Sequence, residues 1–466
     1  MTNKPCDCTR RSALRSLVGG SLLLPGVISN LLAADATASN DIDPLAPRVP
    51  HFPAKAKRVI FLCMSGGVSH VDSFDYKPKL FADAGKAMPG NPHQNNRFLT
   101  RPLWDFKPRG KCGTQVSELF PHIAECVDDI CVINSLKSDH GNHYEATLEI
   151  HTGSFTFTRP SIGSWVSYGL GTVNKNLPSF MVLSHKFPYA GGQTWANDFL
   201  PGCHQGVRVQ GGAGDAIPNM NRRSTTEGMQ DLELGLLNAF NDNHIATRGA
   251  DPALAARIKS FETAFGMQKE APEAFDLSKE TDATLKLYGL QRGSTEGFAW
   301  QCLMARRLAE RGVRFIELID TGAHDNWDNH DDTKKHTPLA KNVDQPIAGL
   351  LKDLKSRGML DDTLVVWTTE FGRTPFVADK NNKGREHHPE VFTSWMAGGG
   401  VKPGMVYGKS DDYGASVAEN LVHVHDFHAT ILHLLGLNHE KLTFRHAGRD
   451  FRLTDVAGKV VKAILA

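Results

Sequence analysis

Histidine and carboxylate side chains gather in five short polar segments of the sequence. The segments are 65–75, 139–145, 320–332, 368–375 and 384–389. Imidazole is a common metal ligand and exchanges protons near neutral pH. Mixed imidazole and carboxylate ligands suit zinc or manganese, whereas sites built only from oxygen ligands suit calcium or magnesium. With 21 histidines in 466 residues, the sequence favours a polar cleft that binds a divalent metal.

Six residues of these segments are predicted metal ligands: Asp72, Asp328, His330, Glu370, His387 and His388. Asp328, His330 and His388 would share one metal, with His387 as the alternative imidazole of the 387–388 pair. Glu370 and Asp72 would lie near a second metal. Ordinary turns and solvated acidic loops use the same residue types, so the prediction depends on the five segments together.

Three further residues are predicted to act on the substrate. His143 lies at the start of a predicted helix, where free N–H groups and the helix dipole favour a bound anion. Arg373 and Arg385 are predicted clamps for sulfate or phosphate oxygens, because a guanidinium donates two parallel hydrogen bonds. The alternatives are surface charge for the two arginines and a surface histidine pair, with His140, for His143.

Buried strands are predicted to position these segments. Continuous apolar runs rich in β-branched residues occur at 58–64, 130–133, 180–183, 313–319 and 363–368, as expected of strands buried on both faces. They alternate with helical patterns at 297–311 and 344–354, which predicts an α/β fold with a largely parallel sheet covered on both sides. Ligands bind outside the carboxyl ends of such strands, where the polar segments fall.

The stretch 219–295 is charged and helix-prone and has no strand pattern, so we predict a helical insertion there. Charges balance over the whole chain, with 52 Lys and Arg against 51 Asp and Glu. No dense basic run or basic stripe with interleaved aromatic residues occurs. The sequence therefore argues against a nucleic-acid partner.

The N-terminus resembles a twin-arginine export signal, because Arg10 and Arg11 precede a weakly apolar run over 17–34. A membrane anchor is the alternative, but two glycines and a proline interrupt a run of minimal length. We predict a signal peptide over 1–34, a linker over 35–56 and one domain over 57–466. The mature protein is expected in the periplasm or outside the cell, with no membrane span.

Six cysteines follow the predicted signal and form no CxxC pair, which argues against a zinc knuckle or a thioredoxin-like site. Export would permit disulfides. A pair between Cys112 and either Cys126 or Cys131 is one alternative, and buried free thiols are the other.

Several motifs are distinctive together: 65–75 (SGGVSHVDSFD), 303–308 (LMARRL), 327–330 (WDNH), 369–375 (TEFGRTP), 384–389 (GREHHP), 397–400, 426–437 and 448–451. They are similar to those of the domain-of-unknown-function 1501 family, exported sulfatase-like proteins of the alkaline phosphatase superfamily. The resemblance implies helices on both sides of a central, largely parallel sheet. It also implies relatives in which a metal-bound Ser, Thr or modified Cys attacks a sulfate or phosphate ester.

The sequence departs from those relatives at the reacting positions. Ser65-Gly66-Gly67 stands where a carboxylate is expected after the first strand, and His143 falls at the place of the nucleophile. Glu370-Phe371-Gly372 replaces an Asp-His-Gly motif, and no Cys-x-Pro-x-Arg motif occurs. Covalent catalysis therefore has no evident agent. His143 as nucleophile or base, attack by water activated by a metal, and no catalysis are the three alternatives.

The sequence thus predicts a metal-dependent hydrolase of sulfate or phosphate esters, with zinc, manganese or calcium as the metal. Its substrate would be a sulfated or phosphorylated polysaccharide or a small ester. A catalytically inactive relative that binds glycans or a cell-envelope partner is the alternative. A structural cell-envelope protein, in which a metal only stabilises the polar loops, is a weaker one.

Overall fold

The computed structural model describes residues 43–89, 97–212, 216–217, 220, 226–249, 251–321 and 326–466. The predicted signal peptide over 1–34 and the linker up to residue 42 lie outside these residues. So do His324 and Asp325 of the polar segment 320–332.

A nine-stranded sheet forms the centre of the domain. The order along the sheet is β14 (Met405–Tyr407), β5 (Ile130–Lys137), β13 (Phe392–Ala397), β9 (Thr363–Thr368), β1 (Arg58–Met64), β8 (Phe315–Asp320), β6 (Phe180–Leu183) and β7 (Val207–Val209), with β17 (Val422–His423) beside β5. All pairings are parallel except the two that β13 makes with β5 and β9. The predicted strands and the largely parallel sheet are confirmed.

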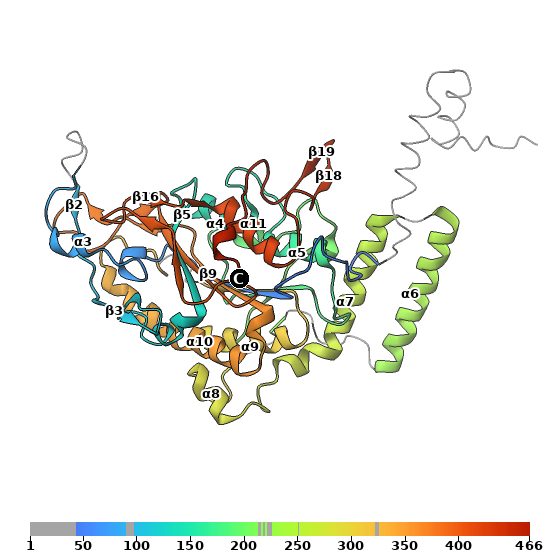
Figure 1. The fold of residues 1–466 in the computed structure, drawn as a ribbon. Helices are drawn as coiled ribbons and strands as arrows, with labels where there is room; N and C mark the ends of the chain where they lie inside the picture. Colours follow the sequence, from blue (N-terminus) through green and yellow to red (C-terminus); the bar gives the residue numbers. More distant parts are fainter. Residues whose placement is uncertain are drawn as a thin grey trace, which may run out of the picture. The chain divides into compact units, whose positions relative to one another are not determined.

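Both faces of the sheet are buried because consecutive strand residues point to opposite sides. In β1, Ile60 and Leu62 join a core with α9 (Phe298–Glu310) and α10 (His336–Ser356). Phe61 joins the opposite core, with α5 (Ile162–Leu170) and α11 (Val424–Leu434). Figure 1 shows these two helix groups on either side of the sheet.

Three helices occupy the predicted insertion: α6 (Glu227–Arg248), α7 (Pro252–Phe275) and α8 (Asp282–Tyr288). Met267 and Tyr288 bring α7 and α8 into the core beside α9 and α10. The buried Tyr288 hydroxyl donates to Asp353 in α10 at 2.9 Å, which fixes α8 in place. Figure 1 shows α6 beside α7 at the edge of the domain.

The remaining elements are short. They are α3 (Pro78–Ala82), α4 (His143–Thr152), β2 (Phe98–Leu99), β3 (Phe106–Arg109), β4 (Thr114–Ser117), β10 (Gly372–Arg373), β11 (Phe376–Val377), β12 (His387–His388), β15 (Lys409–Ser410), β16 (Val417–Glu419), β18 (Phe444–His446) and β19 (Arg449–Phe451). Residues 44–56, which fall in the predicted linker, pack on the domain: Leu45 is buried and the Arg48 amide donates to Leu170.

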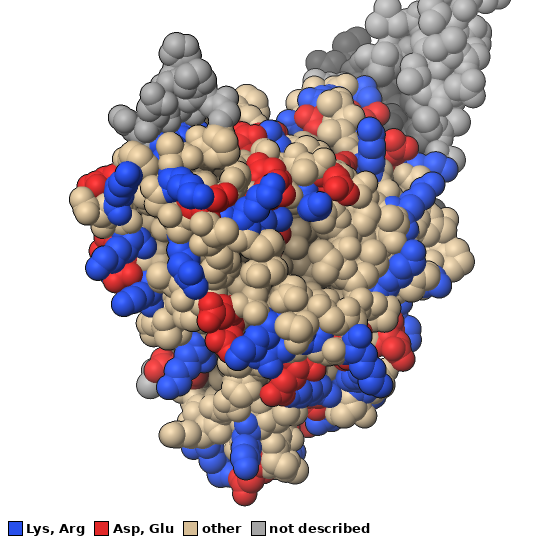
Figure 2. Space-filling model, turned by 60° about the vertical axis from the view of Figure 1, so that its left-hand side comes forward, with Lys and Arg blue, Asp and Glu red and all other residues tan. Residues whose placement is uncertain are grey.

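Cys63, Cys112, Cys126, Cys131 and Cys302 are free thiols. The structure therefore agrees with the alternative of free thiols and has no disulfide between Cys112 and either Cys126 or Cys131. Within the described ranges, every helix is too short or too polar to cross a bilayer. On the face drawn in Figure 2, basic and acidic side chains are interspersed, in keeping with the balanced composition.

Candidate metal centre

The carboxyl ends of parallel strands place the candidate site. Glu370 and Arg373 follow β9, Asp328 lies on the loop after β8, and His143 opens α4 shortly after β5. His387 lies on β12, which pairs with β10 beyond β9. These residues come from distant parts of the chain and meet at one edge of the sheet, as expected for a parallel α/β fold.

Gly66 allows the loop after β1 to approach the loop that carries Asp328. Its φ is +115°, and a Cβ atom there would lie 2.6 Å from the Trp327 amide nitrogen and 2.8 Å from that of Asp328. The positive φ and this close backbone approach both require glycine. The Trp327 indole donates to Asp320 at 2.8 Å and anchors the same loop to the end of β8.

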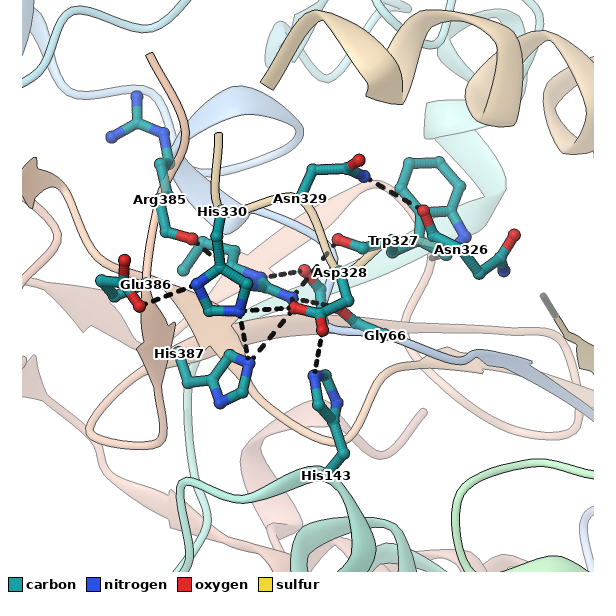
Figure 3. A network of polar contacts seen from close by, with 12 residues as sticks. Gly66, His143, Asn326, Trp327, Asp328, Asn329, His330, Arg385, Glu386 and His387 are labelled. Atoms are coloured by element: carbon teal, nitrogen blue, oxygen red, sulfur yellow. Dashed lines mark hydrogen bonds and ion pairs between the residues drawn. The ribbon is translucent and has the colours of Figure 1, made fainter. Parts of the chain in front are cut away.

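Three imidazoles surround the Asp328 carboxylate (Figure 3). His330 Nε2 lies 2.8 Å and His387 Nε2 3.2 Å from Asp328 Oδ1. His143 Nε2 lies 3.1 Å from Oδ2. The Nε2 atoms of His330 and His387 are only 3.0 Å apart.

The other nitrogen of each imidazole contacts an outer acceptor. His143 Nδ1 lies 2.7 Å from Glu370 Oε1, and His330 Nδ1 lies 2.7 Å from Glu386 Oε2. His387 Nδ1 lies 2.8 Å from the Gly141 carbonyl oxygen. A carbonyl cannot donate and an ionised carboxylate only accepts, so Nδ1 carries the proton in each ring. The lone pair of each Nε2 is then directed at the group around Asp328.

This arrangement fits a divalent metal. Histidine ligands of metals commonly donate their second N–H to a carboxylate or carbonyl, which fixes the tautomer and the ring orientation. The buried Nε2 of His143 has no hydrogen-bond partner despite its proximity to Asp328. One ligand atom each from His143, Asp328 and His387 lies within 4.8 Å of the others. These residues therefore form a candidate metal-binding group.

The electrostatics of the group favour charged carboxylates. Burial alone would raise the pKa of Asp328, but its close contacts with His143 and His387 and the charge of Arg373 hold it well below its usual range. Burial likewise opposes ionisation of Glu370, and the interaction with His143 outweighs it and lowers the Glu370 pKa. Burial would lower the pKa of His143, whereas its two carboxylate neighbours raise it.

The group is open to solvent on one side. The His330 side chain is 39% exposed and that of Asp328 16%, whereas the Glu370 side chain is almost fully buried. The His143 ring packs between Tyr189, at a centroid distance of 4.1 Å, and Phe371, at 4.8 Å. The aromatic rings of Tyr189 and Phe371 thus hold the His143 imidazole, and the group is open to a ligand on the exposed side, near His330.

Arg373 is buried and occupied within the protein. Its side chain donates to the carbonyls of Gly66, Gly67 and Arg385, and its Nη2 contacts Asp328 Oδ1 at 2.6 Å. The guanidinium therefore holds the loop after β1 and orients Asp328. This use of its donors does not fit the predicted clamp for a substrate oxyanion.

The structure does not bring Asp72, Arg385 and His388 to the group around Asp328. Asp72 and Arg385 form a fully buried ion pair at 2.7 Å, and the Arg385 side chain points away from the group in Figure 3. His388 Nε2 donates to the Ala415 carbonyl at 2.9 Å. The predicted convergence is therefore wrong for these three residues, because each has a structural partner elsewhere.

Three contributors to the site were not predicted: Glu386, Tyr189 and the carbonyl of Gly141. Glu386 directly precedes His387 and His388 in the segment 384–389, so its position beside two candidate ligands could have indicated it. A backbone carbonyl and a stacked tyrosine leave no pattern in the sequence, because they depend on how the loops fold.

A second group of possible ligands, Asp139, Glu149 and His423, does not fit a metal. The His423 Nδ1 accepts the His425 amide N–H at 3.2 Å, where it caps α11. The proton of the imidazole must then sit on Nε2, which donates to Asp139 at 3.1 Å. No lone pair is left on the nitrogen that faces the carboxylates.

Comparison with known proteins places the chain in a family. The family described as "Protein of unknown function (DUF1501)" matches residues 56–465, nearly all of the described domain. The chain therefore belongs to this family, as the sequence motifs predicted. No curated protein matches the sequence.

The chain is similar to several solved structures at low identity. The lipoteichoic acid synthase LtaP from Listeria monocytogenes shares 9% identity at a TM-score of 0.36, over 89% of this chain and 79% of that one. Alkaline phosphatase from the Antarctic bacterium TAB5 shares 11% at 0.30, over 82% and 98%. The PsFucS1 sulfatase from Pseudoalteromonas sp. shares 13% at 0.34, over 84% and 69%. Likeness at this distance says nothing about the activity of this chain.

Proposed function

We propose that the protein is a metal-dependent hydrolase of sulfate or phosphate esters. One observation carries the proposal: three imidazoles with their Nδ1 atoms held by outer acceptors direct their Nε2 atoms at one carboxylate. Such a set of three nitrogen ligands and one oxygen ligand suits zinc or manganese better than calcium, which takes oxygen ligands.

In this proposal His143, Asp328, His330 and His387 hold the metal. When bound, a divalent metal activates water near neutral pH and stabilises negative charge on an ester oxygen. Glu370 then serves as a positioning residue for His143 and is not itself a ligand. Arg373 serves Asp328 in the same way, since its guanidinium contacts that carboxylate and not the open side.

The substrate class is proposed from the chemistry of the site and from the sequence resemblance. A sulfated or phosphorylated polysaccharide, or a small ester of the same kind, would approach from the side of His330. The paired arginines Arg10 and Arg11 support a location in the periplasm or outside the cell.

A second candidate function is a catalytically inactive protein that binds glycans or a cell-envelope partner. The observation that favours it is the internal use of both arginines that were predicted to clamp an oxyanion. Arg373 donates to loop carbonyls and Arg385 to Asp72 and Thr374. Neither guanidinium is left for a substrate.

The test combines metal content with turnover. Purified protein is expected to contain near-stoichiometric zinc or manganese and to hydrolyse at least one of para-nitrophenyl sulfate, para-nitrophenyl phosphate and a phosphonate monoester. His387→Ala should lose both properties. His388→Ala is the matched control, because the neighbouring imidazole contacts Ala415 and not the group.

The outcomes separate the two functions. Protein that binds no zinc or manganese, even after both are added, would exclude the proposed metal site. Metal bound at wild-type level by His387→Ala would exclude the ligand assignment. Metal binding with no turnover on the ester panel would favour the inactive binding protein.

A further inference from the structure

A pocket of about 570 Å³ lies beside β14, apart from the candidate metal centre. Its walls come from residues 74–77, 112–115 and 419–420, from Asn134 of β5 and from the turn between β14 and β15. Of the described residues, none that surrounds Asp328 lines it. Asn134 lies three residues before the end of β5, about 10 Å along the strand from the edge of the sheet that carries the metal centre. The volume is in the range of pockets that bind small molecules, about 300–1,000 Å³.

A buried ion pair lines this pocket and gives it polar groups in fixed positions. Lys77 Nζ lies 2.9 Å from Asp75 Oδ1, and the two side chains are only 7% and 4% exposed. Ser410 holds both partners, because its hydroxyl donates to Asp75 and its carbonyl accepts from Lys77 at 3.4 Å. An ammonium group has three hydrogens. Among the described residues it meets two acceptors, so one N–H of Lys77 is left for a ligand.

Asn134 adds a second donor whose position is fixed. Its Oδ1 accepts from the Thr393 hydroxyl at 2.7 Å, and its Nδ2 donates to the Phe74 carbonyl at 3.3 Å. A carbonyl can only accept, so the amide nitrogen must face Phe74. After these contacts with the described part of the chain, one N–H of this buried amide is left. The pocket thus offers two buried donors, from Lys77 and Asn134, to one polar ligand.

The charges around the pocket cancel. Its charged lining residues are Asp75, Lys77, Lys409 and Glu419, two of each sign. Lys409 and Glu419 lie 3.6 Å apart and are exposed, whereas Asp75 and Lys77 form the buried pair. A phosphate or sulfate group therefore finds no unpaired cation among these lining residues. The ligand that the pocket suits is neutral and rich in hydrogen-bonding groups.

Tyr76 gives the pocket an aromatic wall. It is 39% exposed, and its ring is supported by those of Phe106 and Phe81, at centroid distances of 5.2 and 5.9 Å. The face of an aromatic ring is negative and attracts the positive end of C–H bonds. A sugar ring carries C–H bonds on its faces and hydroxyl groups around its edge, and each hydroxyl both donates and accepts. This combination matches an aromatic wall beside polar groups without net charge.

We propose that this pocket binds a neutral sugar, which stacks on Tyr76 and accepts hydrogen bonds from Lys77 and Asn134. An apolar ligand would leave both buried donors unsatisfied, at a cost in free energy. A nucleotide would bring a phosphate charge that the pocket does not balance. The sugar site is separate from the proposed hydrolase, because it needs neither a metal nor turnover.

The test is the binding of neutral sugars to the purified full chain, detected by saturation-transfer NMR and measured by calorimetry. The panel is glucose, galactose, mannose, xylose, N-acetylglucosamine, cellobiose and lactose. At least one should bind, and Tyr76→Ala should weaken its binding about tenfold, since it removes the stacking surface. Phe157→Ala is the matched control, because Phe157 is also an exposed aromatic residue but does not line the pocket. A thermal melt should show that both variants stay folded.

Cys112 can locate the bound sugar. It is an exposed free cysteine on the pocket wall, so a bound sugar should slow its alkylation by iodoacetamide, measured by mass spectrometry of the peptide that contains it. At the same sugar concentration, this protection should be reduced in Tyr76→Ala and kept in His387→Ala, which changes the metal centre. Binding by no sugar of the panel would overturn the proposal. So would binding that leaves the alkylation of Cys112 unchanged, or binding that Tyr76→Ala leaves at wild-type strength. Binding that is lost in His387→Ala would place the sugar at the metal centre and would also overturn it.

Discussion

Replacement of the buried Glu370 by glutamine should weaken metal binding without disturbing the fold. Glu370 Oε1 accepts from His143 Nδ1 at 2.7 Å and from the Gly66 amide at 2.8 Å, and the Thr369 hydroxyl contacts Oε2 at 3.0 Å. Glutamine has the same shape, so its oxygen can keep the first two contacts, and only the negative charge behind His143 is lost. Loss of such an outer partner costs about 10- to 100-fold in metal affinity. This corresponds to about 1.4 to 2.8 kcal/mol.

The assay is a competition between the protein and a chromophoric chelator for zinc. Glu386→Gln is the matched control, because Glu386 holds His330 in the same way but is more than half exposed, so solvent can replace it. We expect a loss of affinity of at most a few fold for Glu386→Gln. Equal zinc affinities for wild type and Glu370→Gln would refute the reasoning, since the charge of Glu370 would then play no part in holding the ligand. A thermal melt should show both variants folded.

Three further predictions follow from buried contacts. Gly66→Ala should lower both zinc affinity and the melting temperature, because its Cβ would displace the Asp328 backbone; unchanged zinc affinity would contradict the close approach. Burial raises the pKa of Glu149 to about 8. The unfolded chain releases this proton at the ordinary glutamate pKa, so the wild-type protein loses stability as the pH rises from that value towards 8. Glu149→Gln should therefore stabilise the protein increasingly with pH, by at most about 5 kcal/mol near pH 8 in urea unfolding, and a gain independent of pH would contradict this. Glu317→Ala should cost about 3–5 kcal/mol of unfolding free energy, because the buried His151 keeps its contact with the Thr147 carbonyl but loses its carboxylate partner at 2.6 Å; a loss below about 1 kcal/mol would refute the pairing.

The sheet could be predicted from the sequence because its strands are buried on both faces. The run 58–64 is continuously apolar, and in the structure alternate side chains of β1 point into two separate hydrophobic cores. The predicted run 313–319 becomes Phe315–Asp320, a shift of one or two residues at each end. Such shifts are expected, because the ends of an apolar run do not fix where its hydrogen bonding stops.

Strand geometry explains which histidine of the 387–388 pair reaches the site. Both imidazoles matched a metal ligand in type, and the assignment from the sequence was His388, whereas His387 is the one beside Asp328. In β12 consecutive side chains point to opposite sides, so only one of the two can face Asp328. Asp328 and His330 are two residues apart and reach the same group from one loop.

The predictions that failed for Asp72, Arg385 and Arg373 share a physical cause. Asp72 and Arg385 lie far apart in the sequence and satisfy each other's charge in the interior. Arg373 is used mainly by backbone carbonyls, which no residue pattern reveals. A sequence shows which side chains have suitable chemistry, but their partners are set by tertiary contacts. The site was therefore predictable in its residue types and only partly in its roles.

The role of His143 shows how the proposed chemistry differs from that implied by the sequence resemblance. A nucleophile at the start of α4 would need a free reactive atom directed at the substrate. The Nδ1 of His143 is instead held by Glu370, and its Nε2 lies 3.1 Å from Asp328 among the other imidazoles. With the Nε2 lone pair bound to the proposed metal and Nδ1 held by Glu370, neither nitrogen would be free to attack an ester or to carry a proton away. Under the proposed function this position supplies a ligand where relatives supply a nucleophile, so water activated by the metal is the remaining attacking group. Hydrolysis in labelled water should then proceed without a covalent enzyme intermediate, and a trapped phosphoryl or sulfuryl adduct on the protein would contradict this assignment.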